Sequence, residues 1–139
     1  MALSEESRSV IAQNFALISQ KIRGDGDLVE KAYVFSHTHG VIQRVFNVEY
    51  DPDLVLVHSV LQAAHSEFAN RLIGIANGNM KDLDERDRLF DSLADAVEEL
   101  GEAIRDNNTL LESLRKIAVV GYIGTSHGHY MFERGVVRI

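Results

Sequence analysis

One stripe of side chains limits the possible folds of this chain more than any other feature. Between residues 54 and 75, apolar or imidazole side chains recur at alternating intervals of four and three residues: Leu54, His58, Leu61, His65, Phe68, Leu72 and Ile75. This spacing is typical of a helix that packs one face against other helices. His58 and His65 therefore occupy positions where a helical bundle normally places leucine or isoleucine, and buried polar groups need partners.

Capping residues indicate where helices begin. Ser4, Asp27, Asp51, Asp82 and Thr109 each suit an N-cap, and a glutamate follows Asp27, Asp82 and Thr109 after three residues, as in a capping box. A proline follows Asp51, where the first helical position tolerates it. Glycines near residues 24 and 78 end two of the helices. We therefore expect about five helices, and their short connections favour an antiparallel bundle.

Apolar seams run along the other predicted helices. They consist of Ile11, Phe15, Ile18 and Ile22 in the first helix, of Leu28, Ala32, Phe35, His39, Ile42 and Phe46 in the second, and of Leu83, Phe90, Leu93, Val97, Leu100 and Ile104 in the fourth. Residues 41–50 and 117–123 also fit a strand, so both readings stay open there, although the spacing favours helix for 41–50. Glycine-rich residues 124–139 predict a partly extended tail of a single domain that spans residues 1–139.

Composition excludes several functional classes. The 139 residues include no cysteine, so disulfide scaffolds, iron–sulfur ligation and thiol chemistry are excluded, and any metal must be held by His, Asp or Glu. A formal net charge of −7 argues against autonomous binding to nucleic acid or to an anionic membrane. The sequence has no apolar run long enough for a membrane span and no signal-peptide pattern, which predicts a cytoplasmic protein.

Three histidines are candidate ligands for a transition metal or a small molecule. If the second and third helices form an antiparallel hairpin that turns near Asp51, His39 lies twelve residues before the turn and His65 fourteen after it. The two should then meet at a similar depth. His58 lies one heptad from His65, about 10 Å along the helix axis, so it belongs to an adjacent layer. The alternative is structural: each imidazole bonds to a nearby polar group and fixes the register of the helices.

The fourth predicted helix carries a stripe of acidic residues. Its members recur at three or four residues on one side: Asp84, Asp87, Asp91, Asp95, Glu98 and Glu102. Like charges at this spacing repel one another by a few tenths of a kcal/mol per pair, so local stability does not explain the stripe. It predicts a solvated face, a cation site or a docking surface for a basic protein partner.

Residues 97–105 in this helix resemble the first metal-binding helix of the all-helical nucleotide pyrophosphatases. In that family a Glu-Glu-x-x-Glu motif holds magnesium, and the resemblance implies a Mg²⁺-dependent hydrolase site at Glu98, Glu99 and Glu102. The second helix of the family carries Glu-x-x-Asp, and that spacing occurs nowhere in this chain. Half of the ligand set is therefore missing.

The function predicted from the sequence is that of a non-catalytic interaction or assembly protein that forms a homo-oligomer. The second helix is apolar on two sides, because Val29, Tyr33, Val41 and Val45 add a second face to its seam. A helix that is apolar on two sides must be covered twice. Transition-metal or ligand binding and Mg²⁺-dependent hydrolysis remain alternatives.

Overall fold

The protein is all-helical. A computed structural model describes residues 1–78 and 86–138, together with the side chains of this part except those of Arg86, Asp87 and Ser126. In this part the chain forms α1 (Glu5–Arg23), α2 (Leu28–Phe46), α3 (Pro52–Ala76), α4 (Arg86–Arg105), α5 (Leu111–Ile123) and α6 (Ser126–Glu133). No helix among the described residues is long and apolar enough to cross a membrane.

The predicted helix starts are confirmed at three positions. The side chains of Ser4, Asp27 and Asp51 accept hydrogen bonds from the backbone N–H groups of Ser7, Glu30 and Asp53. The start predicted at Thr109 is wrong, because α5 follows Leu110, which makes no side-chain cap. The capping box at residues 82 and 85 lies outside the described residues, as does Leu83 of the fourth seam.

The chain has more helix than its sequence pattern suggested. Residues 41–46 continue α2 and residues 117–123 continue α5, so the helical reading is confirmed for these segments. The partly extended tail and the count of about five helices are not confirmed, because residues 126–133 form a sixth helix, α6. The Thr125 side chain accepts a hydrogen bond from the Gly128 N–H and so caps this short helix.

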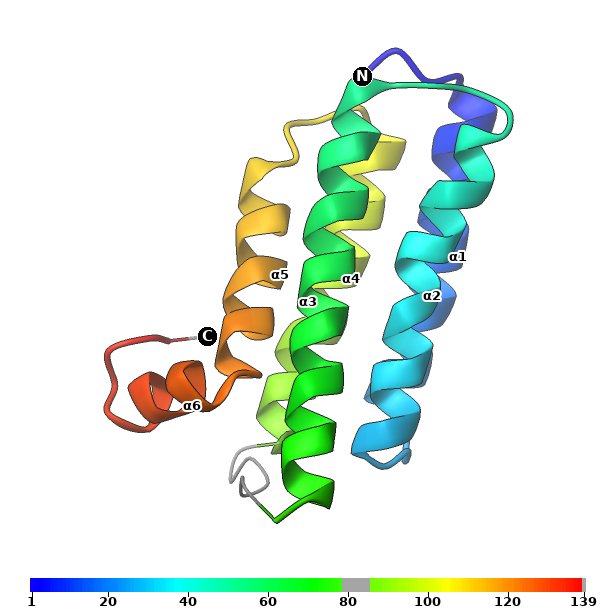
Figure 1. Cartoon of the computed structure of the whole chain (residues 1–139). Coiled ribbons are helices and arrows are strands. Elements are labelled where there is room, and N and C mark those ends of the chain that lie inside the picture. Colours follow the sequence, from blue (N-terminus) through cyan, green and yellow to red (C-terminus); the bar gives the residue numbers. More distant parts are fainter. Residues whose placement is uncertain (79–85, 139) are drawn as a thin grey trace.

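Five helices lie side by side, and each is connected to a neighbour that runs in the opposite direction (Figure 1). The contacts follow a ring in the order α1, α2, α3, α5, α4 and back to α1, while α6 packs against α5. Neighbours α3 and α5 run in the same direction because α4 lies between them in the sequence (Figure 1). Each of these five helices therefore has two neighbours in the ring, and α5 also contacts α6.

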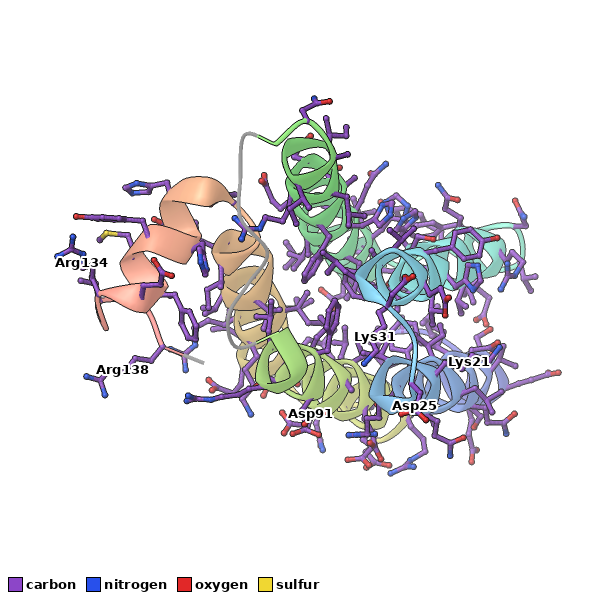
Figure 2. All side chains as sticks on the ribbon, turned by 90° about the horizontal axis from the view of Figure 1, so that it is seen from below. Lys21, Asp25, Lys31, Asp91, Arg134 and Arg138 are labelled. Atoms are coloured by element: carbon purple, nitrogen blue, oxygen red, sulfur yellow. The ribbon has the colours of Figure 1, made fainter. Side chains whose placement is uncertain are left out.

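An aromatic row crosses the core between α2, α3 and α4. The Phe68 ring lies 6.0 Å from that of Phe35 and 5.9 Å from that of Phe90, which links α2, α3 and α4. The Lys31 ammonium lies 5.2 Å from the centre of the Phe90 ring, at the end of the core seen in Figure 2. Buried apolar side chains of α1 to α5 complete this core.

Two glycines set the distance between neighbouring helices. A Cβ atom at Gly101 of α4 would lie 3.0 Å from the Phe15 Cβ of α1. A Cβ atom at Gly121 of α5 would lie only 2.9 Å from both Cα and Cβ of Ala64 in α3. Both helix pairs are therefore closer than any larger side chain would permit at these positions.

Candidate functional site

The histidines of α3 lie beside its buried face and not at its centre. The fully buried positions of this helix are Leu54, Val57, Leu61, Ala64, Phe68 and Arg71, whereas His58 and His65 are half-buried. The prediction that His58 and His65 occupy core positions is therefore wrong. The reason is that α3 packs against both α2 and α5, so its buried face is broad and extends away from the imidazoles.

His39, His58 and His65 nevertheless form one cluster, which we call the histidine cluster. The ring centre of His39 lies 5.4 Å from that of His65 and 5.7 Å from that of His58. The contact between His39 and His65 predicted from the helical hairpin is thereby confirmed. His39 thus lies between the two layers that His58 and His65 occupy.

Three buried nitrogens of this cluster lack hydrogen-bond partners. Both ring nitrogens of His39 and the Nε2 atom of His58 are buried without a hydrogen bond. Burial of an unpartnered polar group costs about 1–3 kcal/mol. As the rings stand, no group of three or more His, Asp or Glu side chains in the described residues could hold a metal ion.

Burial also affects protonation in the cluster. It lowers the pKa of His39, and the nearby charges of His65, His58 and His37 lower the pKa of His39 further. Burial lowers the pKa of His65 as well. Both imidazoles are therefore harder to protonate in the folded protein than in the unfolded chain.

Acid is expected to destabilise the fold through these two groups. The pKa values of both groups are lower in the folded protein than in the unfolded chain, so the unfolded chain binds protons more tightly. Protonation below the ordinary histidine pKa of about 6.5 therefore favours the unfolded state. The free energy of unfolding should fall as the pH drops from about 8 to below about 6.5. Urea denaturation at a series of pH values should give a smaller fall for His39→Leu, whereas the control Leu17→Ala, which changes an exposed side chain of α1, should retain the wild-type dependence. An unchanged pH dependence in His39→Leu would contradict this assignment.

The remaining histidines make separate local contacts. The His37 ring packs edge-on against Tyr33 at 4.8 Å, on the exposed side of α2. His129 pairs with Glu133 at 3.1 Å within α6. These residues do not extend the histidine cluster.

Two of the three glutamates of the predicted magnesium site pair with cations of neighbouring helices. Glu98 pairs with Arg23 of α1 at 2.8 Å, and Glu99 pairs with Lys116 of α5 at 2.7 Å. Glu102 is exposed. The acidic stripe is thus flanked by basic residues, a feature that the pattern of α4 alone does not contain. Asp84 and the side chain of Asp87 lie outside the described part of the chain.

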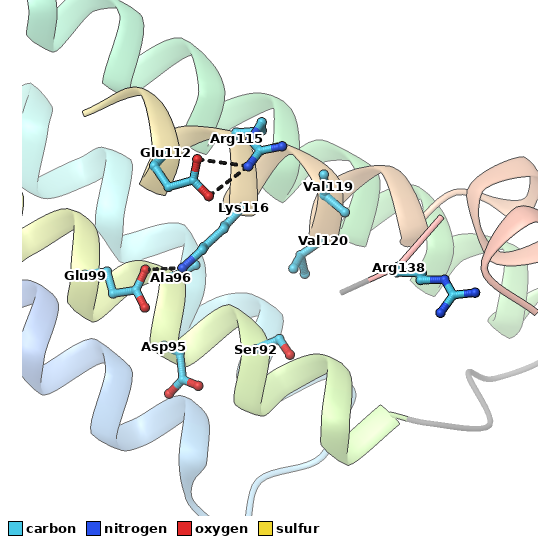
Figure 3. Close-up of a pocket in the computed structure, with 10 residues that line it drawn as sticks. All are labelled: Ser92, Asp95, Ala96, Glu99, Glu112, Arg115, Lys116, Val119, Val120 and Arg138. Atoms are coloured by element: carbon cyan, nitrogen blue, oxygen red, sulfur yellow. Dashed lines mark hydrogen bonds and ion pairs between the residues drawn. The ribbon is translucent and has the colours of Figure 1, made fainter. Parts of the chain in front are cut away.

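A charged cleft of about 430 Å³ lies between α4 and α5 (Figure 3). Its floor is apolar, and charged side chains line the rim. Most of these charges are paired within the cleft: Lys116 with Glu99, and Arg115 with Glu112 at 2.8 Å. The cleft is therefore a set of surface ion pairs, each of which contributes about 0–1 kcal/mol.

A second groove, of about 270 Å³, lies between α3 and α5 and is mostly apolar. Small residues form its floor, because Ala64 and Gly121 bring the two helices together. The outer surface around it carries large apolar side chains as well. Leu56 is 55% exposed, Leu111 is 75% exposed and Tyr122 is 37% exposed.

Comparisons with known proteins do not assign a function. No protein family matches the sequence, and no significant match is found to curated proteins or to solved structures.

Proposed function

We propose that this protein is a non-catalytic assembly module that forms a homodimer through the outer surface of α3 and α5. This surface, the α3–α5 face, comprises Leu56, Val60, Ala63, Leu111, Ala118 and Tyr122. Five of these side chains are exposed and Val60 is half-buried. Contiguous exposed apolar surface of this kind typically marks an interaction site.

The predicted second apolar face of α2 supports self-association less well. Val41 and Val45 are buried in the core of the same chain, which corrects that part of the expectation. Val29 and Tyr33 are exposed and lie one turn apart on the same side of α2, so they form only a small apolar surface. The α3–α5 face is larger and draws on two helices.

The spacing of large and small residues on this face is self-complementary. Leu56 precedes Ala63 by seven residues in α3, and Leu111 precedes Ala118 by seven residues in α5. Seven residues are two helical turns, or about 10.5 Å, so each pair shares one side of its helix. Because α3 and α5 run in the same direction with Gly121 level with Ala64, the two leucines lie within about a turn of each other in height.

A twofold axis across the helices would use this spacing. An axis that runs across the helices, midway between the leucines and the alanines, would place the leucines of each copy against the alanines of the other copy. Such an isologous contact buries the same residues on both subunits. Arg115 lies near this axis, and its charge is balanced by Glu112.

The size of the face predicts a dimer that depends on concentration. The 13 residues of α5 span about 20 Å, and two adjacent helices are about 20 Å wide. The footprint is therefore about 400 Å² per copy, compared with about 800 Å² per partner in a stable complex of standard size. We expect dissociation upon dilution.

A charged residue in this face is expected to disrupt the dimer. Leu56→Glu should raise the dissociation constant at least about tenfold, because association would bury an unpaired carboxylate. Sedimentation at increasing protein concentration measures the effect. The matched control is Leu17→Glu, which changes a leucine of similar exposure, 57%, on α1 and should leave the dimer intact.

A mixing experiment tests the twofold geometry itself. Ala63→Lys should also dissociate the homodimer, yet a mixture of Leu56→Glu and Ala63→Lys should form a heterodimer in which the new carboxylate meets the new ammonium. A wild-type protein that stays monomeric at high concentration would overturn the assembly proposal. Failure of the mixture to associate would overturn the proposed arrangement of the two copies.

A further inference from the structure

The histidine cluster contains buried nitrogens at which a ligand can bind. His39 contributes two buried nitrogens without hydrogen bonds. The ring centres of His58 and His65 each lie within 6 Å of the His39 ring centre. A neutral imidazole nitrogen without a hydrogen is a good ligand for a divalent transition metal. Coordination would give His39 the partner that the fold itself does not supply.

The ring spacing suits a shared metal ion. Two imidazoles bound to one tetrahedral ion at a metal–nitrogen distance of about 2.0–2.1 Å have ring centres roughly 5 Å apart. The ring centres of His39 and His65 are 5.4 Å apart, so the backbones of α2 and α3 already have the required separation. The proposed site requires rotation of both side chains, so that one nitrogen of each ring faces the ion.

The directions of the helices favour His65 over His58 as the second ligand. In an α-helix each Cα–Cβ bond tilts toward the N-terminus of that helix. Because α2 and α3 are antiparallel (Figure 1), the side chain of His39 tilts toward the level of His65, and that of His65 tilts back toward His39. His58, on the other side of His39, tilts away from it. His58 and His65 are also about 10.5 Å apart along α3, too far to meet without large movements.

We propose that His39 and His65 bind one divalent transition-metal ion across the seam between α2 and α3. Water fills the remaining coordination positions, so the affinity should follow ligand chemistry, with Cu²⁺ bound more tightly than Ni²⁺ or Zn²⁺. The ion requires neutral imidazoles, and protons therefore compete with it. The site does not depend on the proposed dimer, since both ligands belong to one chain.

Titration of the untagged protein with Cu²⁺, Ni²⁺ and Zn²⁺ at pH 7.5, followed by calorimetry, tests the proposal. We expect one ion per chain, a higher melting temperature with metal, and weaker binding at pH 5.5 than at pH 7.5. Imidazole nitrogen NMR shifts upon Zn²⁺ addition should change at His39 and His65. Binding should persist in Leu56→Glu, which separates this proposal from that of the dimer.

Variants identify the ligands. His65→Leu and His39→Leu should remove stoichiometric binding while keeping the helical circular dichroism spectrum. His58→Leu and His37→Leu are the controls and should retain binding within about threefold. Absence of stoichiometric binding in the wild type would overturn the proposal, and so would a site that survives in His65→Leu but is lost in His58→Leu.

Discussion

Replacement of Phe68 by alanine is expected to lower the free energy of unfolding by about 3–5 kcal/mol, the largest effect predicted for this chain. Phe68 is 1% exposed, and its ring contacts those of Phe35 and Phe90. Its removal would leave a cavity at the point where α2, α3 and α4 meet. Neighbouring rings can fill such a cavity only in part, because each is held by the helix that carries it.

Urea denaturation followed by circular dichroism measures this loss. The matched control is Ile73→Ala, which removes an apolar side chain from the same helix at a position that is 60% exposed. It should change the stability by no more than about 0.5 kcal/mol. If Phe68→Ala costs less than about 1 kcal/mol, the aromatic row is not a main element of the core.

The spacing of apolar residues predicted which segments are helical, but it placed the buried face of α3 incorrectly. Leu54, Leu61 and Phe68 belong both to the predicted stripe and to the buried face. The predicted stripe and the observed buried face differ at the intervening positions, where Val57 and Ala64 are buried in place of the histidines. A helix with two neighbours has a broad apolar face, and a single row of residues does not locate its centre.

The meeting of His39 with His65 could be predicted, whereas the ion pairs of α4 could not. A short connection between antiparallel helices fixes their register, so counting residues from the turn gives the depth of each side chain. The pair between Lys116 and Glu99 depends on α5 being adjacent to α4 on a particular side. The packing of the whole chain decides which helices are adjacent, and no local sequence pattern indicates it.

Glycine content gave a wrong prediction for the C-terminal residues. Gly128 lies inside α6, where it is buried. A Cβ atom at Gly128 would overlap the backbone oxygen of Tyr122, so glycine is needed there for close packing against the end of α5. A glycine in a sequence therefore indicates either an extended loop or a close approach of two backbones, and only the fold distinguishes them.

Gly121 and Gly40 are both glycines within helices, yet substitution by alanine is expected to change stability in opposite directions. Alanine is favoured over glycine in a helix by about 0.5–1 kcal/mol. At Gly40 an added Cβ would meet only the end of the Arg44 side chain, at 3.9 Å, so Gly40→Ala should stabilise the protein by this amount. It serves as the control for helix propensity.

Gly121→Ala is expected to destabilise the protein by about 1–3 kcal/mol, because overpacking outweighs the gain in helix propensity. The new Cβ would lie 2.9 Å from the Ala64 Cα, which is backbone and cannot rotate away, so α3 and α5 must separate. Ala64→Gly should rescue the variant only in part, since the contact with Cα remains. The same separation would displace Leu111 relative to Leu56 and weaken the proposed dimer, which sedimentation would detect. Stabilisation of Gly121→Ala comparable to that of Gly40→Ala would show that the α3–α5 contact is loose enough to accept a methyl group.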